Sequence, residues 1–144
     1  MLAINPYLNF NGNTEEAFNH YKSVFGGEFA MVMRFKDSPA AANTPEKDQD
    51  KLMHIALPLA NGSMLMGTDA IGEGGMPFVT IGNNFSLTIS AESREEADKL
   101  YSGLAEGGNP VSPMHDEFWG DYFGWLTDRF GINWMITYNP NATK

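Results

Sequence analysis

The sequence predicts an α+β fold made of two βαβββ modules. The run Glu15-Glu16-Ala17-x-x-x-Tyr21 recurs as Glu95-Glu96-Ala97-x-x-x-Tyr101, at an offset of 80 residues. One strand-like run precedes each of these segments, and three follow it. So long a repeat in only two copies indicates a duplicated unit rather than a solenoid, which stacks many short repeats. We therefore expect one domain over residues 1–144, with a first module at about 1–70, a linker at about 71–83 and a second module at about 84–144.

Capping signals predict where the two helices begin and end. Asn13 is expected to cap the first helix and Ser93 the second, each followed three residues later by a glutamate in the capping-box spacing. The helices are expected to end at Gly26-Gly27 and at Gly107-Gly108, because glycine readily adopts the left-handed conformation that closes a helix. Between these ends, apolar residues recur at helical spacing, which indicates one buried face on each helix.

Strand-like runs bounded by turn residues predict the strands. These runs cover residues 4–10, 28–35, 52–59 and 63–68 in the first module, and 85–90, 109–113, 122–127 and 134–138 in the second. The long polar segment from Asp37 to Asp50 is expected to be a disordered surface excursion, with a lid as the alternative. The glycine-rich stretch from Ala70 to Asn83 is expected to be a linker. Its run Gly72 to Gly75 lacks the Lys-Ser/Thr pair and the following helix of a phosphate-binding loop.

Composition narrows the classes of partner. The net charge of −9 disfavours nucleic acid, whose phosphates are bound by Lys and Arg, and it equally disfavours an anionic membrane surface. The chain has no apolar run of membrane-spanning length and no signal-peptide pattern at its start. It contains no cysteine, which excludes disulfides and thiolate zinc sites and makes the cytoplasm the expected location. A small molecule or a partner protein remains.

A hairpin signal at Asn61-Gly62 suggests a candidate catalytic pair. Between two strand-like runs, Asn-Gly predicts a two-residue type I′ turn. With that register His54 lies directly opposite Asp69, on a face that it shares with the small residues Ala56 and Gly67. A histidine beside a carboxylate is suited to act as a general base or as half of a metal-binding pair. The alternative is a cross-strand ion pair that only stabilises the sheet.

The last quarter of the chain contains all three tryptophans and a cluster of acidic residues. Its aromatic side chains are candidates for the walls of a ligand pocket, with hydrophobic core as the alternative. They are Trp119, Tyr122, Trp125 and Trp134. His115 stands just before them and is equally consistent with a site residue and with an exposed loop residue. No serine-nucleophile motif and no zinc-binding histidine spacing occurs.

The doubled βαβββ pattern resembles the vicinal oxygen chelate superfamily, which includes glyoxalase I, bleomycin-resistance proteins and extradiol dioxygenases. The closing run from Phe118-Trp119-Gly120-Asp121 to Trp134-Met135-Ile136, with the opening Pro6-Tyr7-Leu8-x-Phe10, is similar to its PhnB-like branch. Related proteins have carried the label 3-demethylubiquinone methyltransferase. The resemblance implies two modules that form a U-shaped mixed sheet around a cavity, in a homodimer.

The resemblance also implies where a metal would bind. Metal-dependent members place His or Glu on the first and last strands of each module, which corresponds here to positions near Tyr7, Asp69 and Ser86 and to Met135. Of these, only Asp69 is a ligand for a hard divalent ion, so no cofactor is expected and a divalent metal is disfavoured. The sequence contains no glycine-rich strand-turn-helix motif for a nucleoside cofactor, so it does not support the methyltransferase label.

The sequence thus favours a cytoplasmic, homodimeric protein that binds a small, partly aromatic or apolar molecule, as bleomycin-resistance proteins do. The candidate ligand-binding residues are Tyr7, His115, Trp119, Tyr122 and Trp134. The alternative is an enzyme of lyase, isomerase or dioxygenase-like type. In it, His54 polarised by Asp69 moves a proton, or the two rebuild a metal site with His115. A third hypothesis, a fold used for protein interaction only, predicts sheet cavities filled by side chains.

Overall fold

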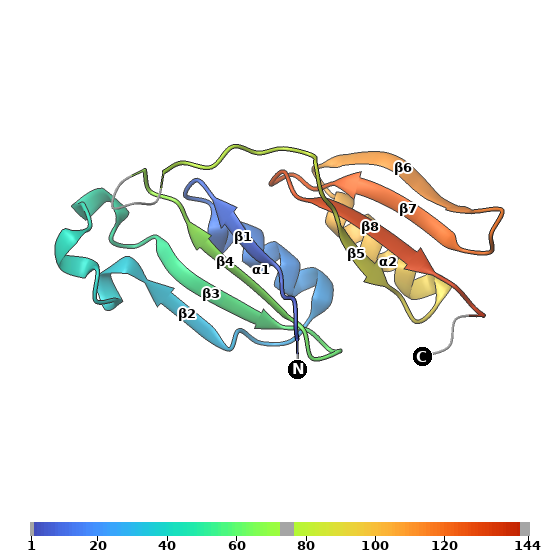
Figure 1. Ribbon diagram of the computed structural model, residues 1–144, viewed down its shortest axis with the longest axis horizontal. Helices are drawn as coiled ribbons and strands as arrows, with labels where there is room; N and C mark the ends of the chain where they lie inside the picture. Colours follow the sequence, from blue (N-terminus) through green and yellow to red (C-terminus); the bar gives the residue numbers. More distant parts are fainter. Residues whose placement is uncertain (1, 73–76, 142–144) are drawn as a thin grey trace. The chain divides into compact units, whose positions relative to one another are not determined.

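The computed structural model describes residues 2–72 and 77–141. The chain divides into two compact units, residues 1–80 and 81–144, and each has the order strand, helix, strand, strand, strand (Figure 1). Each unit consists of one α-helix and a four-stranded mixed sheet, so the predicted α+β fold is confirmed. Of the glycine-rich run 72–75, residues 73–75 lie outside the described residues. No helix in the described part of the chain is long and apolar enough to cross a membrane.

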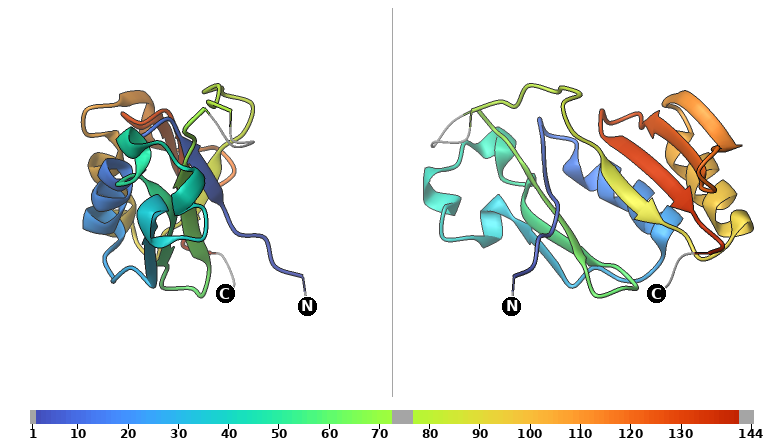
Figure 2. Two further views of the ribbon diagram at one scale, coloured as in Figure 1. Left: turned by 90° about the vertical axis from the view of Figure 1, so that its left-hand side faces the viewer. Right: turned by 45° about the vertical axis from the view of Figure 1, so that its right-hand side comes forward.

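The first unit packs helix α1, Thr14–Phe25, on one side of its sheet (Figure 2). The strands are β1 (Tyr7–Phe10), β2 (Met31–Arg34), β3 (Leu52–Pro58) and β4 (Met64–Asp69), in the spatial order β1-β4-β3-β2. β1 runs parallel to β4, and the other neighbours are antiparallel. The core residues of this unit are Leu8, Phe10, Ala17, Phe18, Tyr21, Leu52, Ile55, Leu57 and Leu65. Gly67 lets α1 approach β4, because a Cβ there would lie 2.6 Å from the Phe18 ring.

The segment from residue 35 to residue 51 is folded, contrary to the disorder expected from its composition. It forms three 3-10 turns, η1 (Phe35–Asp37), η2 (Ala41–Asn43) and η3 (Glu46–Asp48). The Gln49 side-chain amide donates to the carbonyls of Ala41 and Thr44, at 2.8 and 2.7 Å. Polar side chains therefore provide hydrogen-bond partners for backbone carbonyls within the segment. For this reason the segment is ordered despite its low apolar content.

The second unit repeats the arrangement. Helix α2 (Arg94–Ala105) packs on a sheet of β5 (Leu87–Ser90), β6 (Asn109–Asp116), β7 (Tyr122–Thr127) and β8 (Asn133–Tyr138), in the order β5-β8-β7-β6. β5 runs parallel to β8. The buried residues Ala97, Leu104, Leu126, Phe130, Trp134 and Ile136 form its core.

The two helices begin in different ways. The Ser93 hydroxyl accepts a hydrogen bond from the Glu96 N–H at 3.0 Å, so the predicted cap of α2 is confirmed. Asn13 makes no side-chain cap, which corrects the prediction for α1. Instead, one oxygen of Asp69 accepts hydrogen bonds from the N–H and the hydroxyl of Thr14, at 3.0 and 2.6 Å. A carboxylate at a helix N-terminus also interacts favourably with the helix dipole.

Candidate functional site

The hairpin at Asn61-Gly62 has a three-residue loop, not the predicted two-residue turn. The Leu59 N–H donates to the Ser63 carbonyl at 2.8 Å, and Gly62 takes a left-handed φ of +91°. This is the pattern of a turn followed by a left-handed residue, the next most common hairpin connection. The pairing shifts by one residue as a result, so that Leu57 lies opposite Leu65. A one-residue shift exchanges which side chains of the two strands share a face.

The predicted pair of His54 and Asp69 does not form. Asp69 is 1% exposed and lies on the helix side, where its second oxygen accepts the Leu52 N–H at 2.8 Å and its first is bound by Thr14. His54 lies on the opposite face, where its Nδ1 and the Tyr7 hydroxyl are joined by a hydrogen bond of 2.9 Å. Asp69 therefore neither polarises His54 nor offers an oxygen to a rebuilt metal site.

The face of the first sheet that carries no helix is called here the open face of the first sheet. The register places on it Tyr7, Met31, Met33, His54, Ala56, Met64 and Met66. Burial raises the pKa of Tyr7, although 44% of the residue remains exposed. The structure thus brings together two candidates that the sequence named for different roles, Tyr7 and His54.

Tyr122 and Trp134 lie on the helix side of the second sheet. The Trp134 residue is 3% exposed, and its indole N–H donates to Asp128 at 2.9 Å. The Tyr122 hydroxyl donates to Asp98 of α2 at 2.5 Å, and the Arg94 guanidinium lies over its ring. Bonding to this carboxylate raises the pKa of Tyr122. The contacts of Tyr122 with Asp98 and Arg94 join α2 to the sheet.

Trp119 and His115 lie toward the connection between β6 and β7. Trp119 is 54% exposed, and its indole N–H donates to Asp121 at 2.7 Å. The His115 ring contacts the Pro113 carbonyl through Nδ1 at 2.7 Å and the Glu117 carboxylate through Nε2 at 2.6 Å. The Pro113 carbonyl first, and Glu117 second, raise the pKa of His115 above its ordinary value of 6.5.

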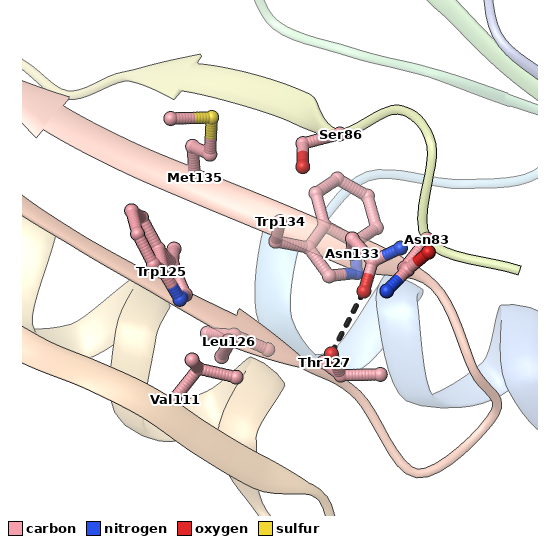
Figure 3. A pocket seen from close by; sticks show the side chains of 9 residues that line it. All are labelled: Asn83, Ser86, Val111, Trp125, Leu126, Thr127, Asn133, Trp134 and Met135. Atoms are coloured by element: carbon pink, nitrogen blue, oxygen red, sulfur yellow. Dashed lines mark hydrogen bonds between the residues drawn. The ribbon is translucent and has the colours of Figure 1, made fainter.

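A pocket of about 350 Å³ opens on the second sheet (Figure 3). Its lining consists of Asn83, Ser86, Val111, Trp125, Leu126, Thr127, Asn133, Trp134 and Met135. Trp125 and Met135 are paired across β7 and β8, and Trp125 is 43% exposed. The amide of Asn133 is fixed, since it donates to the carbonyls of residues 82 and 85 and accepts from the Thr127 hydroxyl at 2.7 Å. No lining side chain carries a formal charge.

Sequence reasoning found this pocket only in part. Trp134 was a predicted wall residue, but its side chain is almost entirely buried in the core. Trp125 was considered as a wall residue and was not among the final candidates. The usable signal was the alternation in β7, where Gly124 and Leu126 are buried and Trp125 therefore faces away from α2. Asn83 fell within the predicted linker, and its side chain comes to the pocket only through the path of the chain before β5.

The fold is similar to that of glyoxalase and bleomycin-resistance proteins. A glyoxylase/bleomycin resistance protein/dioxygenase domain from Frankia sp. EAN1pec matches with a TM-score of 0.65, covering 96% of this chain and 98% of that chain. The sequences are 15% identical, so this likeness concerns the fold alone.

The family follows from closer matches. A protein-family model described as 3-demethylubiquinone-9 3-methyltransferase matches residues 2–137, and the chain belongs to this family, the PhnB-like branch predicted from its closing run. The structure of protein PA1353 from Pseudomonas aeruginosa is 36% identical, with a TM-score of 0.82 and coverage of 96% of this chain and 98% of that one. A putative 3-demethylubiquinone-9 3-methyltransferase, PhnB protein, from Bacillus cereus is 30% identical, with a TM-score of 0.74 and coverage of 95% and 99%.

The divalent metal of the wider superfamily does not fit the residues present here. Both Asp69 oxygens are engaged by backbone and hydroxyl donors, and Met135 offers a thioether where a hard ion needs oxygen or nitrogen. Within residues 2–72 and 77–141, no three His, Asp or Glu side chains gather closely enough to hold a metal ion.

Proposed function

We propose that the protein binds a small, partly aromatic molecule in the pocket on its second sheet. The observation that carries this proposal is the pocket itself, which has about 350 Å³, an exposed indole wall and no charged lining residue. Sites for small molecules typically start at about 300 Å³ and combine apolar walls with a few polar groups. This pocket has that composition.

The lining residues suggest how such a molecule would be held. Trp125 presents a ring that already packs edge-on against Phe123, with ring centroids 5.8 Å apart, and its open side is available for stacking. Met135 is flexible and adapts to the shape of a ligand. Asn83 and Ser86 supply hydrogen-bonding groups at one end of the pocket (Figure 3).

In this proposal the protein binds the molecule without converting it chemically. The methyl transfer named in the family description is not part of it, because the described sheets are not the doubly wound type in which a glycine-rich turn holds a nucleoside cofactor. The homodimer and the cytoplasmic location expected from the sequence belong to the same proposal.

A fluorescent titration tests the proposal. N-phenyl-1-naphthylamine is uncharged, aromatic and more fluorescent in apolar surroundings, so we expect it to bind the wild-type protein. Trp125→Ala should weaken this binding about tenfold, which corresponds to about 1.4 kcal/mol. Trp119→Ala is the matched control, since it removes another exposed indole that does not line the pocket. Equal affinity of the wild type and Trp125→Ala would refute the proposed site. A thermal-shift screen of aromatic metabolites then narrows the natural ligand.

A further inference from the structure

Methionine is concentrated on the open face of the first sheet. Of the nine methionines in the chain, four lie there: Met31 and Met33 on β2, and Met64 and Met66 on β4. Strand propensity does not account for this choice, because strands favour β-branched and aromatic residues. Core packing does not account for it either, because the core of the unit lies on the α1 side. What methionine adds is a thioether sulfur, which is a ligand for soft metal ions.

Three of these methionines and His54 occupy register positions next to Ala56 on the same face of the sheet. The register pairs Ala56 with Met31 on one side and with Met66 on the other. It also pairs His54, two residues earlier on β3 and on the same face, with Met33. Neighbouring strands lie about 4.8 Å apart, so these side chains are long enough to meet above the Ala56 methyl group.

Ala56 and its neighbour Met31 differ in their exposure to solvent. Ala56 is 5% exposed, although it lies on the face that carries no helix. Met31, which is paired with Ala56 on β2, is 46% exposed, so a cation from solvent has access to its thioether.

The imidazole of His54 is held in a way that suits a metal ligand. Its Nδ1 is joined to the Tyr7 hydroxyl at 2.9 Å, and the two rings lie 5.6 Å apart. When Nε2 binds a metal, Nδ1 carries the proton and donates it to the Tyr7 oxygen. Such a second contact fixes the orientation of a metal-binding histidine and the nitrogen that it presents.

We propose that the open face of the first sheet binds one soft monovalent cation, Cu(I) or its redox-inert analogue Ag(I), through Met31, Met33, Met66 and His54. Thioether and imidazole ligands favour Cu(I), whereas Mg²⁺ and Ca²⁺ need oxygen ligands. None of the residues that define this face carries a carboxylate. The site is separate from the pocket on the second sheet and does not depend on the function proposed for it.

A Ag(I) titration of the full chain, followed calorimetrically, tests the proposal. We expect one tight site per chain, a loss of affinity of at least thirtyfold in the double variant Met31→Leu/Met66→Leu, and no competition by Mg²⁺. Met114→Leu is the control, because Met114 lies on β6 in the other unit. Methionine and leucine have similar volumes, and thermal unfolding verifies that the variants fold. Unchanged Ag(I) affinity in the double variant would overturn the proposal.

Methyl NMR provides a second readout that does not depend on a variant. On addition of one equivalent of Ag(I), the methyl signals of Met31, Met33 and Met66 should move together while those of Met114 and Met135 stay in place. Shifts spread evenly over all methionines would show nonspecific sulfur binding and would also overturn the proposal. Binding of N-phenyl-1-naphthylamine should be unchanged in Met31→Leu/Met66→Leu, which distinguishes this site from the pocket.

Discussion

Asp69→Ala should be one of the most destabilising substitutions in the first unit. The carboxylate accepts the N–H of Thr14 at 3.0 Å and the N–H of Leu52 at 2.8 Å, and the side chain is buried. Alanine leaves both N–H groups without an acceptor in the interior. Each orphaned buried group costs about 1–3 kcal/mol, so we expect a loss of about 4 kcal/mol in the free energy of unfolding. The Thr14 hydroxyl is buried and loses the same acceptor, which adds to this loss.

Urea unfolding followed by circular dichroism measures the effect. Asp50→Ala is the matched control, because Asp50 pairs with Lys36 at 2.8 Å at the surface with 84% of its side chain exposed. Exposed pairs contribute about 0–1 kcal/mol, so the control should change stability by less than that. Asp69→Asn should fall between the two, since an amide keeps one acceptor oxygen but turns an N–H toward a backbone N–H. A loss below about 1 kcal/mol for Asp69→Ala would refute the view that this carboxylate serves the fold.

Three further outcomes follow from the described contacts. Gly108→Ala should lower the free energy of unfolding in urea by about 3 kcal/mol, because its Cβ would lie 2.5 Å from the Thr127 carbonyl oxygen. Gly82→Ala is the control and should be close to neutral, because no atom lies within 4 Å of its Cβ. His115 has a folded-state pKa above 6.5, so its stabilising effect is fully present below pH 6.5 and lost as the pH rises through the folded-state pKa. The Tm difference between wild type and His115→Gln should accordingly shrink from pH 5.5 to pH 8.5, and a constant difference would contradict the assignment. Hydrogen bonding to Arg34 lowers the pKa of Glu15. The stability that the Glu15 carboxylate adds is therefore present above pH 4.5 and is lost as the pH falls through the lowered pKa. Glu15→Gln should remove this acid-sensitive part of the dependence of Tm on pH.

Local signals were sufficient to predict the two α-helices and the eight strands, but not the 3-10 turns between β2 and β3. The repeat of Glu-Glu-Ala-x-x-x-Tyr correctly predicted the duplication, and the strand β7 matches its predicted range, residues 122–127. Such features depend on neighbours in the sequence, where periodicity and capping residues act directly. The cap of α1 was missed because its acceptor, Asp69, is far from Thr14 in the chain and local spacing carries no trace of the contact.

The candidate site was harder to predict because it depended on a single register. Asn61-Gly62 is compatible with two loop lengths, and the glycine takes a left-handed φ in both. The longer loop separates His54 from Asp69 onto opposite faces and brings His54 to Tyr7 instead. An error of one residue therefore left the fold unchanged but exchanged the chemical partners of the histidine. In contrast, the face of Trp125 followed from the alternation within its own strand and needed no distant contact.

The parallel pairing of the first and last strands has a consequence for the order of folding. β1 pairs with β4, and β5 pairs with β8, so each sheet joins the beginning of its unit to the end. Such distant pairings form slowly, because a long loop must close before any contact is made. During synthesis, the first sheet therefore cannot be completed until Asp69 has left the ribosome. From then on the Asp69 carboxylate can accept hydrogen bonds from the first residue of α1, Thr14, and from the first residue of β3, Leu52. The unit should then become protected from hydrogen exchange as a whole. The backbone amides of β1 and β4 should gain this protection at the same time rather than one strand after the other.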